Sequence, residues 1–417
     1  MATRVRYRVL GLAMLLAGIT YLDRICISMA APGIQKDLGL TDVQMGYVFS
    51  AFTLAYAIFE IPTGAWGDKV GTRRVLTRIV LWWSAFTCIT GAAFNYASLL
   101  ATRFLFGAGE AGAWPNVART FSRWFPLAER GTVQGIFFMG AHAAGGVTPF
   151  LVQRLLNDYH VHWRTMFVVF GSLGFLWCAA WYWWFRDEPS EHSAVSPQEL
   201  ALIEKGRPPK SGHHLDWAVW KQILGSTTVW ALCGMYFTQS YGFMFYITWL
   251  PKYLRTERGF DSDALGLLAG LPLTLSVFAD LFGGLSSDWA SRRFGLRLGR
   301  GMVGGGSLFL AGMFVVAGTR VSDPWLSAVL IAIGGGLSAF LLGAAWGTIL
   351  DIGGNHTGVV GAAMNTAGQV GAFICPILAS HLVQWGFSWH TPLYVTGVLY
   401  MLGALCWFKI DPTKRVF

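Results

Sequence analysis

The sequence predicts an all-α polytopic membrane protein with twelve transmembrane helices in two pseudo-symmetric six-helix halves around a central cavity. Three observations support this fold class: an apolar composition, twelve apolar stretches of membrane-spanning length, and a charged loop motif that occurs twice. Of the 417 residues, 54% are hydrophobic and only 13% are charged, and the mean hydropathy is +0.48. A soluble domain carries about 25% charged residues.

Each predicted helix is a run of about 20 mainly apolar residues, the length that crosses the hydrocarbon core of a bilayer. The first half contains six such runs, at 9–31, 43–64, 75–94, 98–118, 133–156 and 164–185. The second half contains six more, at 225–251, 264–287, 301–319, 324–349, 357–384 and 391–409. We therefore expect the lipid bilayer to surround the chain.

A polar segment with four Pro residues divides the chain into two halves, at 1–186 and 223–417, joined by a linker loop over 187–222. The loop that follows the second helix reads Gly, three residues, Asp and then an Arg pair, and the loop after the eighth helix repeats this order 220 residues later. Duplicated six-helix halves are typical of transporters, which bind substrate near the midplane of the membrane. The repeated charged residues are Asp68, Arg73 and Arg74 in the first loop and Asp288, Arg292 and Arg293 in the second, preceded by the acids Glu60 and Asp280.

The net charge of +9 orients the chain in the membrane and does not indicate a nucleic-acid partner. Of the 31 Lys and Arg residues, 22 lie in alternate loops or at the termini, 7 lie on the other side and 2 lie within helices. Lys and Arg concentrate on the cytoplasmic side of membrane proteins. We therefore expect a cell membrane protein, inner or plasma membrane, with both termini and the linker in the cytoplasm. Cleavage of the first helix as a signal peptide is not expected, because it would leave an odd number of helices.

No cofactor or metal site is expected. The six Cys residues all fall within predicted helices, with no CxxC pair and no His at metal-ligand spacing. The chain also lacks GxxxxGK[ST], HExxH and GxSxG motifs, so the sequence gives no indication of an enzyme.

Several motifs in the predicted helices belong together. They are Tyr21-Leu22-Asp23-Arg24 in the first helix, Arg103 with Gly107-Ala108-Gly109-Glu110-Ala111-Gly112 and Pro115 in the fourth, Thr248-Trp249-Leu250-Pro251-Lys252-Tyr253-Leu254 in the seventh, and Asn365-Thr366-Ala367-Gly368 in the eleventh. With the loop from Gly64 to Arg74, they make the chain resemble the major facilitator superfamily and, within it, the anion:cation symporters. That family includes bacterial sugar-acid and phthalate carriers and vertebrate sialic acid and glutamate carriers. The resemblance covers essentially the whole chain and implies a carrier for organic anions.

Two adjacent charges, Asp23 and Arg24, interrupt the first apolar helix. A charged residue at the centre of a membrane helix costs roughly 2.5 to 3.5 kcal/mol or more, so it usually has a function. Tyr21 and Arg24 share a helix face, whereas Asp23 is turned by about 100° and does not simply pair with Arg24. We expect Arg24, together with Tyr21, to hold a substrate carboxylate on the cavity face and Asp23 to lean toward the fourth helix. The alternative is a structural ion-pair network.

The fourth helix places Arg103 and Glu110 on one stripe, about 10 Å apart. Glu110 is the predicted proton carrier, because a carboxylic acid in a low-dielectric site can titrate near working pH. The alternative is a salt bridge that never titrates. For Arg103 we expect charge balance and helix pairing, with direct substrate contact as the alternative.

A charge count predicts the mechanism. With Asp23 and Glu110 ionised, Arg24 and Arg103 bring the sum of charges to zero, so a bound monovalent anion leaves one uncompensated negative charge. Such a charge is costly in a low dielectric, and protonation of one acid removes it. We therefore predict H⁺ as the coupling ion, with Asp23 and Glu110 titrating as a coupled pair.

Other polar residues within the helices are candidates for contact with a hydroxyl-rich substrate, since such a substrate needs several donors and acceptors. Tyr56 and Asn365 are the strongest of these. For the other candidates, interhelical hydrogen bonding or packing is at least as plausible: Trp346, Gln369, His142, Gln239 and Tyr241.

The repeated loops are predicted to act as gating latches rather than substrate sites. Asp68 is expected to accept hydrogen bonds from a helix N-terminus or to pair with Arg119 or Arg123. Asp288 would repeat this with Arg292 and Arg293. Glu60 and Asp280 are interpreted as residues that line the mouth of the carrier, with a second titrating site as the alternative.

The predicted function is a secondary active transporter that imports an organic carboxylate with protons by alternating access. Sugar acids such as galactonate, glucarate or a hexuronate, or a phthalate-like anion, suit the residue types, and a monocarboxylate is favoured because no Lys or Arg lies mid-helix in the second half. The alternatives are an organic-anion exchanger, a facilitated uniporter and, more distantly, a membrane sensor. We expect a monomer with a small organic anion as its partner.

Overall fold

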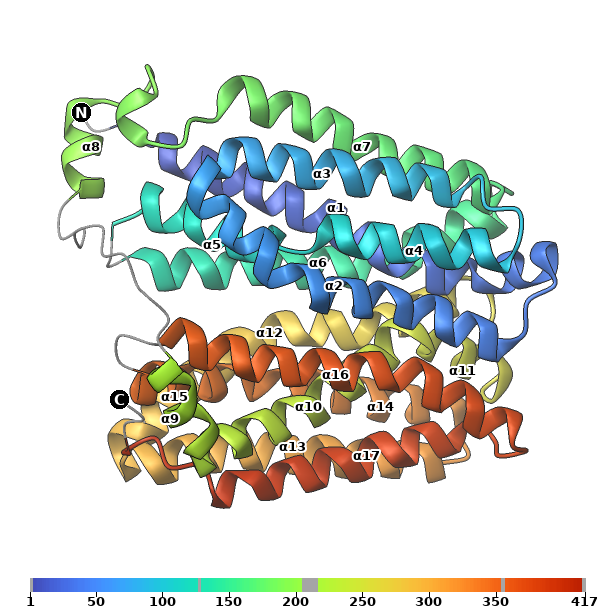
Figure 1. The fold of residues 1–417 in the computed structure, drawn as a ribbon. Helices are drawn as coiled ribbons and strands as arrows, with labels where there is room; N and C mark the ends of the chain where they lie inside the picture. The colour runs from blue at the N-terminus through green and yellow to red at the C-terminus, as the bar shows by residue number, and fades with distance from the viewer. Residues whose placement is uncertain (1–2, 127–128, 205–216, 354–356, 415–417) are drawn as a thin grey trace. The chain divides into compact units, whose positions relative to one another are not determined.

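The computed structural model describes residues 3–126, 129–204, 217–353 and 357–414. Within them the chain is helical, and the twelve predicted runs all fall on helices (Figure 1). Eight of the described helices are long and apolar enough to cross a membrane by themselves. The predicted all-α polytopic fold is confirmed.

The first six predicted runs correspond to seven helices, because the fourth run is divided in two. The helices are α1 (Val5–Leu38), α2 (Asp42–Val70), α3 (Thr72–Thr90), α4 (Tyr96–Glu110), α5 (Ala113–Trp124), α6 (Arg130–Asn157) and α7 (Trp163–Trp184).

The last six runs are likewise built from more than six helices. They are α10 (Thr227–Thr248), α11 (Leu250–Thr256), α12 (Ser262–Phe294), α13 (Leu296–Arg320), α14 (Pro324–Phe340), α15 (Leu342–Gly353), α16 (Thr357–Gln384) and α17 (His390–Leu405), followed by the short 3₁₀ helix η4 (Cys406–Phe408). The seventh run is divided at Trp249 and the tenth at Leu341.

Local signals explain several helix ends. Asn95 and Ser98 form a capping box at the start of α4, in which the Asn95 side chain accepts from the Ser98 amide at 2.8 Å. Asp323 caps α14, and Pro324 occupies its first turn. Gly39 ends α1 with a φ of 65°, a conformation that a glycine adopts without strain.

The described part of the predicted linker includes short helices. It contains the short 3₁₀ helix η2 (Pro189–Glu191) and the helices α8 (Pro197–Glu204) and α9 (Trp217–Gly225). Glu199 of α8 is buried and accepts hydrogen bonds from the backbone amides of Val5 and Arg6, both at 3.1 Å, so it caps α1. The free N–H groups at a helix start explain why a distant carboxylate binds there.

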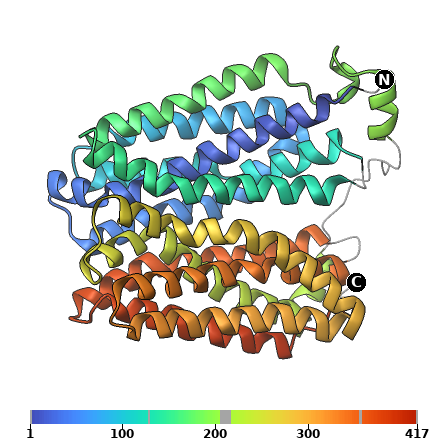
Figure 2. The ribbon, with the colours of Figure 1, turned by 180° about the vertical axis from the view of Figure 1, so that it is seen from behind.

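The chain forms two compact units. Unit 1 contains Met1–Leu40, Ala51–Ala144 and Leu155–Gly212, and unit 2 contains Thr41–Ser50, Gly145–Arg154 and His213–Phe417. In unit 1, α3 runs beside α7, and α7 also contacts α1 (Figures 1 and 2). In unit 2, α10 packs on α16, and α13 packs on α14 and α17. The halves drawn from the sequence, at 1–186 and 223–417, stay a prediction.

Candidate functional site

The centre of the candidate site is an ion pair between α1 and the end of α4. The Arg24 Nε atom donates to Glu110 Oε1 at 2.5 Å, and the Nη2 atom of Arg24 binds the same oxygen. The Glu110 side chain is fully buried, and that of Arg24 is 15% exposed. Arg24 thus has a carboxylate partner within its own unit, which places the predicted anion-binding and proton-carrying residues in direct contact.

Four aromatic rings surround the Arg24 guanidinium, and we call them the aromatic cage. Its carbon Cζ lies 5.2 Å from the ring centres of Phe52 and Tyr56, 5.8 Å from that of Trp114 and 5.9 Å from that of Tyr21. Ring faces attract a cation at this range. The cage stabilises the Arg24 cation in an apolar environment, while the nitrogen atoms of its guanidinium bind Glu110.

The cage was only partly predictable. Tyr21 and Tyr56 were predicted as substrate contacts, whereas Phe52 and Trp114 were not. The signal for Phe52 was present, since it lies four residues before Tyr56 and shares its helix face.

A break between α4 and α5 sets the position of Glu110, and it corrects the predicted continuous helix over 98–118. Glu110 is the last residue of α4, and Gly112 has a φ of 84°, which favours glycine. The side chain of Asn116 donates to the Gly112 carbonyl at 2.8 Å and holds the break. The end of a helix carries partial negative charge, so an ionised Glu110 depends on Arg24 for stabilisation.

A second cluster lies around Asp23, which is fully buried. Its Oδ2 atom lies 3.4 Å from the hydroxyl of Thr87 in α3, a residue that was not among the predicted site residues. Arg103 of α4 is within electrostatic range of Asp23 and Glu110. Asp23 therefore faces the third helix as well as the expected fourth, because the 100° turn from Arg24 points it away from the aromatic cage.

Polar atoms of both clusters lack partners among the described residues. They are Oδ1 of Asp23, Oε2 of Glu110, and Nε and Nη1 of Arg103. The Arg103 guanidinium is instead stacked on the ring of Phe106, with its Cζ atom 4.2 Å from the ring centre. Buried polar groups usually have partners. These atoms are available for a proton, a water molecule or an anion.

His142 of α6 lies at the edge of the aromatic cage. Its ring centre is 5.8 Å from that of Tyr21 in an edge-to-face arrangement, and the residue is buried. The structure thus brings a residue predicted only as a lesser candidate close to the predicted site. Its role as a ligand contact or a packing residue stays a prediction.

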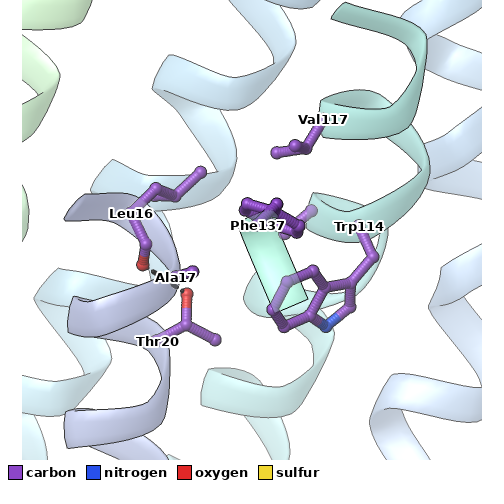
Figure 3. Close-up of a pocket in the computed structure, with 7 residues that line it drawn as sticks. Leu16, Ala17, Thr20, Trp114, Val117 and Phe137 are labelled. Carbon is purple, nitrogen blue, oxygen red and sulfur yellow. Dashed lines mark hydrogen bonds between the residues drawn. The ribbon is translucent and has the colours of Figure 1, made fainter. Parts of the chain in front are cut away.

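A narrow apolar gap lies next to the cage and is too small to admit a water molecule. Figure 3 shows Leu16, Ala17 and Thr20 of α1 facing Trp114, Val117 and Phe137 of α5 and α6. The Thr20 hydroxyl donates to the Leu16 carbonyl at 2.9 Å, so its polar atom is satisfied within α1 (Figure 3). Trp114 lines both this gap and the cage.

The remaining substrate candidates lie in unit 2. Asn365 and Gln369 are half-buried on α16, and Trp346 on α15 is 42% exposed, with its ring centre 6.4 Å from that of Tyr236. Gln239 and Tyr241 are buried on α10, and Gln239 Oε1 accepts from the Ser240 hydroxyl at 3.4 Å. Their roles in binding stay predictions.

The first predicted latch lies only partly within the described residues, and the pairing expected for Asp68 stays a prediction. The side chain of Asp68 lies outside the described residues. Arg123 pairs with Glu188 at 2.9 Å, and Arg119 is within electrostatic range of the same carboxylate. Arg73 donates to the carbonyl of Tyr182 at 2.8 Å through Nε. The acids after α7, which the sequence analysis did not single out, therefore supply carboxylate partners here.

The second predicted latch is wrong in its basic residues. Asp288 pairs with Arg300 at 3.2 Å, and Arg300 also binds Ser287 at 2.9 Å and Asp351 at 3.2 Å. Arg292 and Arg293 are exposed and make no ion pair with the described residues. Arg300 replaces them because it lies on the buried side of the first turns of α13, whereas the Arg pair faces outward from the last turn of α12. The position of Arg300 one turn into an apolar helix was the available signal.

Glu60 and Asp280 are both half-buried. Their roles at the mouth of the carrier stay predictions. The described residues contain no cluster of three His, Cys, Asp or Glu side chains that could hold a metal ion.

Comparison with solved structures identifies the fold. Two crystal structures of a bacterial homologue of the human lysosomal transporter Spinster, both inward-facing, match with TM-scores of 0.78 and 0.76 at 18% identity. Each comparison covers 98% of this chain and 97% of the other chain.

Comparison with known sequences identifies relatives. A probable sulfoacetate transporter of Cupriavidus necator is 36% identical, over 99% of this chain and 95% of the relative. A probable galactarate/D-glucarate transporter of Bacillus subtilis is 30% identical, over 99% and 94%. A probable L-galactonate transporter of Escherichia coli is 29% identical, over 99% and 93%. The family model of the major facilitator superfamily matches residues 13–376. With this family-model match and these relatives, the chain belongs to the major facilitator superfamily, as its motifs predict.

Proposed function

We propose that the protein is a secondary active transporter that imports a small organic anion together with protons. The observation that carries this proposal is the Arg24–Glu110 ion pair inside the aromatic cage. A cation that binds an anion and an acid that binds a proton are in direct contact there. Binding of the two ligands is therefore linked by one shared interaction.

The anion is proposed to replace Glu110 on Arg24. A guanidinium offers a planar fork that suits carboxylate and sulfonate oxygens, and charge-assisted hydrogen bonds are among the strongest. While Glu110 is ionised, it occupies this fork. Protonation of Glu110 removes its charge and frees Arg24 for the substrate.

The four charged residues of the two clusters around Arg24 and Asp23 support coupling to protons. Asp23, Glu110, Arg24 and Arg103 sum to zero when all are ionised. A monovalent anion would leave one negative charge unbalanced in a buried site, and one proton on Glu110 or Asp23 restores the balance. Import by alternating access in the cell membrane, with both termini in the cytoplasm, completes the proposal.

The names of the relatives define the proposed substrate class. They name sulfoacetate, galactarate, D-glucarate and L-galactonate, all small aliphatic acids. We propose a substrate of this kind for this chain, with its acidic group on Arg24. Sulfonates enter the class through the relative from Cupriavidus necator, which broadens the sugar-acid prediction made from the sequence.

Uptake into proteoliposomes tests the proposal. We expect an inward proton gradient to drive accumulation of at least one of sulfoacetate, galactonate and glucarate, with acetate as the reference anion. Arg24→Lys should weaken substrate binding roughly 10- to 100-fold, because an ammonium keeps the charge but replaces the bidentate contact and loses one charge-assisted hydrogen bond. Arg320→Lys, an exposed site at the end of α13, is the matched control.

Two outcomes would contradict the proposal. If Arg24→Lys binds the substrate with wild-type affinity, then the anion does not bind at Arg24. Uptake that proceeds as counterflow and ignores the proton gradient would instead indicate an exchanger.

A further inference from the structure

A groove between α3 and α7 in unit 1 is separate from the aromatic cage. It encloses about 320 Å³ and is lined by Arg74, Thr77, Arg78 and Tyr182. The two helices that form it run side by side (Figure 1). None of these residues contributes to the Arg24–Glu110 pair.

The groove carries two positive charges, those of Arg74 and Arg78. Arg74 and Arg78 are one helical turn apart, so they project from the same face of α3. Both are exposed, and neither makes an ion pair with a described carboxylate. Arg73 differs, because its guanidinium binds the Tyr182 carbonyl and stacks on that ring at 4.6 Å. The nearby Asp187 is already bound to the hydroxyl of Thr72 and the amide of Arg73.

Aromatic residues place the groove at the depth of lipid headgroups. Arg78 stacks on Trp66 with its Cζ atom 5.0 Å from the ring centre, while Tyr182 and Trp183 are 45% and 74% exposed. Trp and Tyr are enriched at the interface between the hydrocarbon core and water. The groove lies where α3 begins and α7 ends, and membrane helices begin and end near the interface between the hydrocarbon core and water.

The exposed surface of α7 continues from the groove as an apolar strip. Its exposed side chains are those of Val168, Val169, Leu173, Phe175 and Leu176. This surface suits an acyl chain, while the two guanidinium groups suit a phosphate. A free anion in water has no acyl chain and would not contact the apolar strip.

We propose that this groove binds the phosphate of an anionic phospholipid, with Arg74 and Arg78 as its cationic ligands. Each guanidinium donates to phosphate oxygens, and the hydroxyl of Tyr182 is available as a further donor. A zwitterionic headgroup satisfies the site less well, because its own cation competes for the phosphate. Phosphatidylglycerol is therefore bound in preference to phosphatidylcholine.

Native mass spectrometry of the full-length protein, exchanged into mixed phosphatidylglycerol and phosphatidylcholine micelles, tests the site. The wild type should retain phosphatidylglycerol preferentially. The Arg74→Gln/Arg78→Gln variant should retain it roughly 5- to 30-fold less well, as expected for two Arg residues near an anionic lipid. Arg292→Gln/Arg293→Gln removes the same charge from another exposed Arg pair and should retain it like the wild type.

A charge-preserving variant and a competition with inorganic phosphate complete the test. Arg74→Lys/Arg78→Lys preserves the charge and should restore most of the retention, which separates lipid binding from misfolding. Unchanged retention in Arg74→Gln/Arg78→Gln, or an equal loss in both Gln variants, would overturn the proposal. Displacement of phosphatidylglycerol by inorganic phosphate at millimolar concentration would overturn the lipid as the ligand and assign the groove to free phosphate.

Discussion

The Nε atom of Arg24 donates a 2.5 Å hydrogen bond to Oε1 of Glu110, while Oε2 of the same carboxylate has no partner among the described side chains. One oxygen of Glu110 therefore neutralises the cation and the other is open to a proton. This division of a single carboxylate is the physical basis for the proposed coupling between anion and proton.

Glu110→Gln should uncouple uptake from the proton gradient. Glutamine resembles the protonated acid in shape and charge, so Arg24 would stay free for the anion at every pH. We expect substrate binding to persist and to lose its pH dependence, and proton-driven accumulation in proteoliposomes to be abolished. Counterflow without a gradient should remain.

Glu204→Gln, on the exposed surface of α8, is the control for that experiment. It removes one carboxylate far along the chain from the cage and should accumulate substrate normally. If Glu110→Gln still accumulates substrate in response to the proton gradient, Glu110 is not the proton carrier.

Gly107→Ala should destabilise the contact between α2 and α4. A Cβ atom at Gly107 would lie only 3.0 Å from the carbonyl carbon and Cα of Phe52, and closer still to its carbonyl oxygen. Overpacking of this kind costs about 1–3 kcal/mol. Thermal unfolding in detergent should show the loss, and displacement of the Phe52 ring should also weaken anion binding at Arg24.

Gly135→Ala on α6 is the matched substitution, because a Cβ atom there meets nothing within 4 Å. It should leave stability unchanged or raise it slightly, since Ala favours a helix over Gly by about 1 kcal/mol. Equal unfolding temperatures for the two variants would refute the close approach at Gly107.

Arg300→Lys should destabilise unit 2. Arg300 donates to Asp351 through Nε and to both Ser287 and Asp288 through Nη1, and a single ammonium cannot reproduce that geometry. We expect a loss of about 1–3 kcal/mol, from the hydrogen bonds to a charged group. Chemical unfolding in detergent measures it, with Arg320→Lys as the exposed control. A wild-type unfolding midpoint would show that the cluster contributes no stability.

Acid should release the start of α1 from α8. Burial of Glu199 opposes its ionisation, but hydrogen bonds from Thr3 and from the amides of Arg6 and Val5 outweigh it and hold the pKa of Glu199 below its ordinary value. A lowered folded pKa means that the stabilisation is fully present above the unfolded pKa, near 4.3. It is lost as the pH falls through the lower folded value.

Hydrogen exchange checks this pH dependence. Protection of the amides of Val5 and Arg6 should be constant from neutral pH down to about 5 and should fall at more acidic pH. Glu199→Gln should lower this protection roughly 5- to 100-fold even at pH 7, because a neutral amide binds these donors more weakly. Wild-type protection in Glu199→Gln would contradict the capping role.

The positions of the membrane helices could be predicted because hydrophobic length is a local property. The break after Glu110 was harder to see. Gly112 was visible in the sequence, but glycines also occur where helices approach closely, as Gly107 does. Only the positive φ of Gly112 distinguishes a glycine at a helix break from a glycine at a close contact between helices.

Side-chain partners were the least predictable feature, since periodicity gives the direction of a side chain and not the identity of its neighbour. Helical geometry separated Asp23 from Arg24, but it could not identify Thr87 on another helix. The Arg pair after Asp288 suggested a partner close in sequence, while the actual partner, Arg300, belongs to the next helix.

Asp23 and Arg24 are consecutive residues of α1, which is continuous from Val5 to Leu38. Their Cα atoms are separated by one peptide unit of about 3.8 Å, a length that does not change. A shift or rotation of α1 that draws Arg24 away from Glu110 must also move Asp23 relative to Thr87. In the proposed transport cycle, α1 would therefore move as one rigid helix that carries both Asp23 and Arg24. A change in the contacts of either residue would change the position of the other, because the two are covalently adjacent.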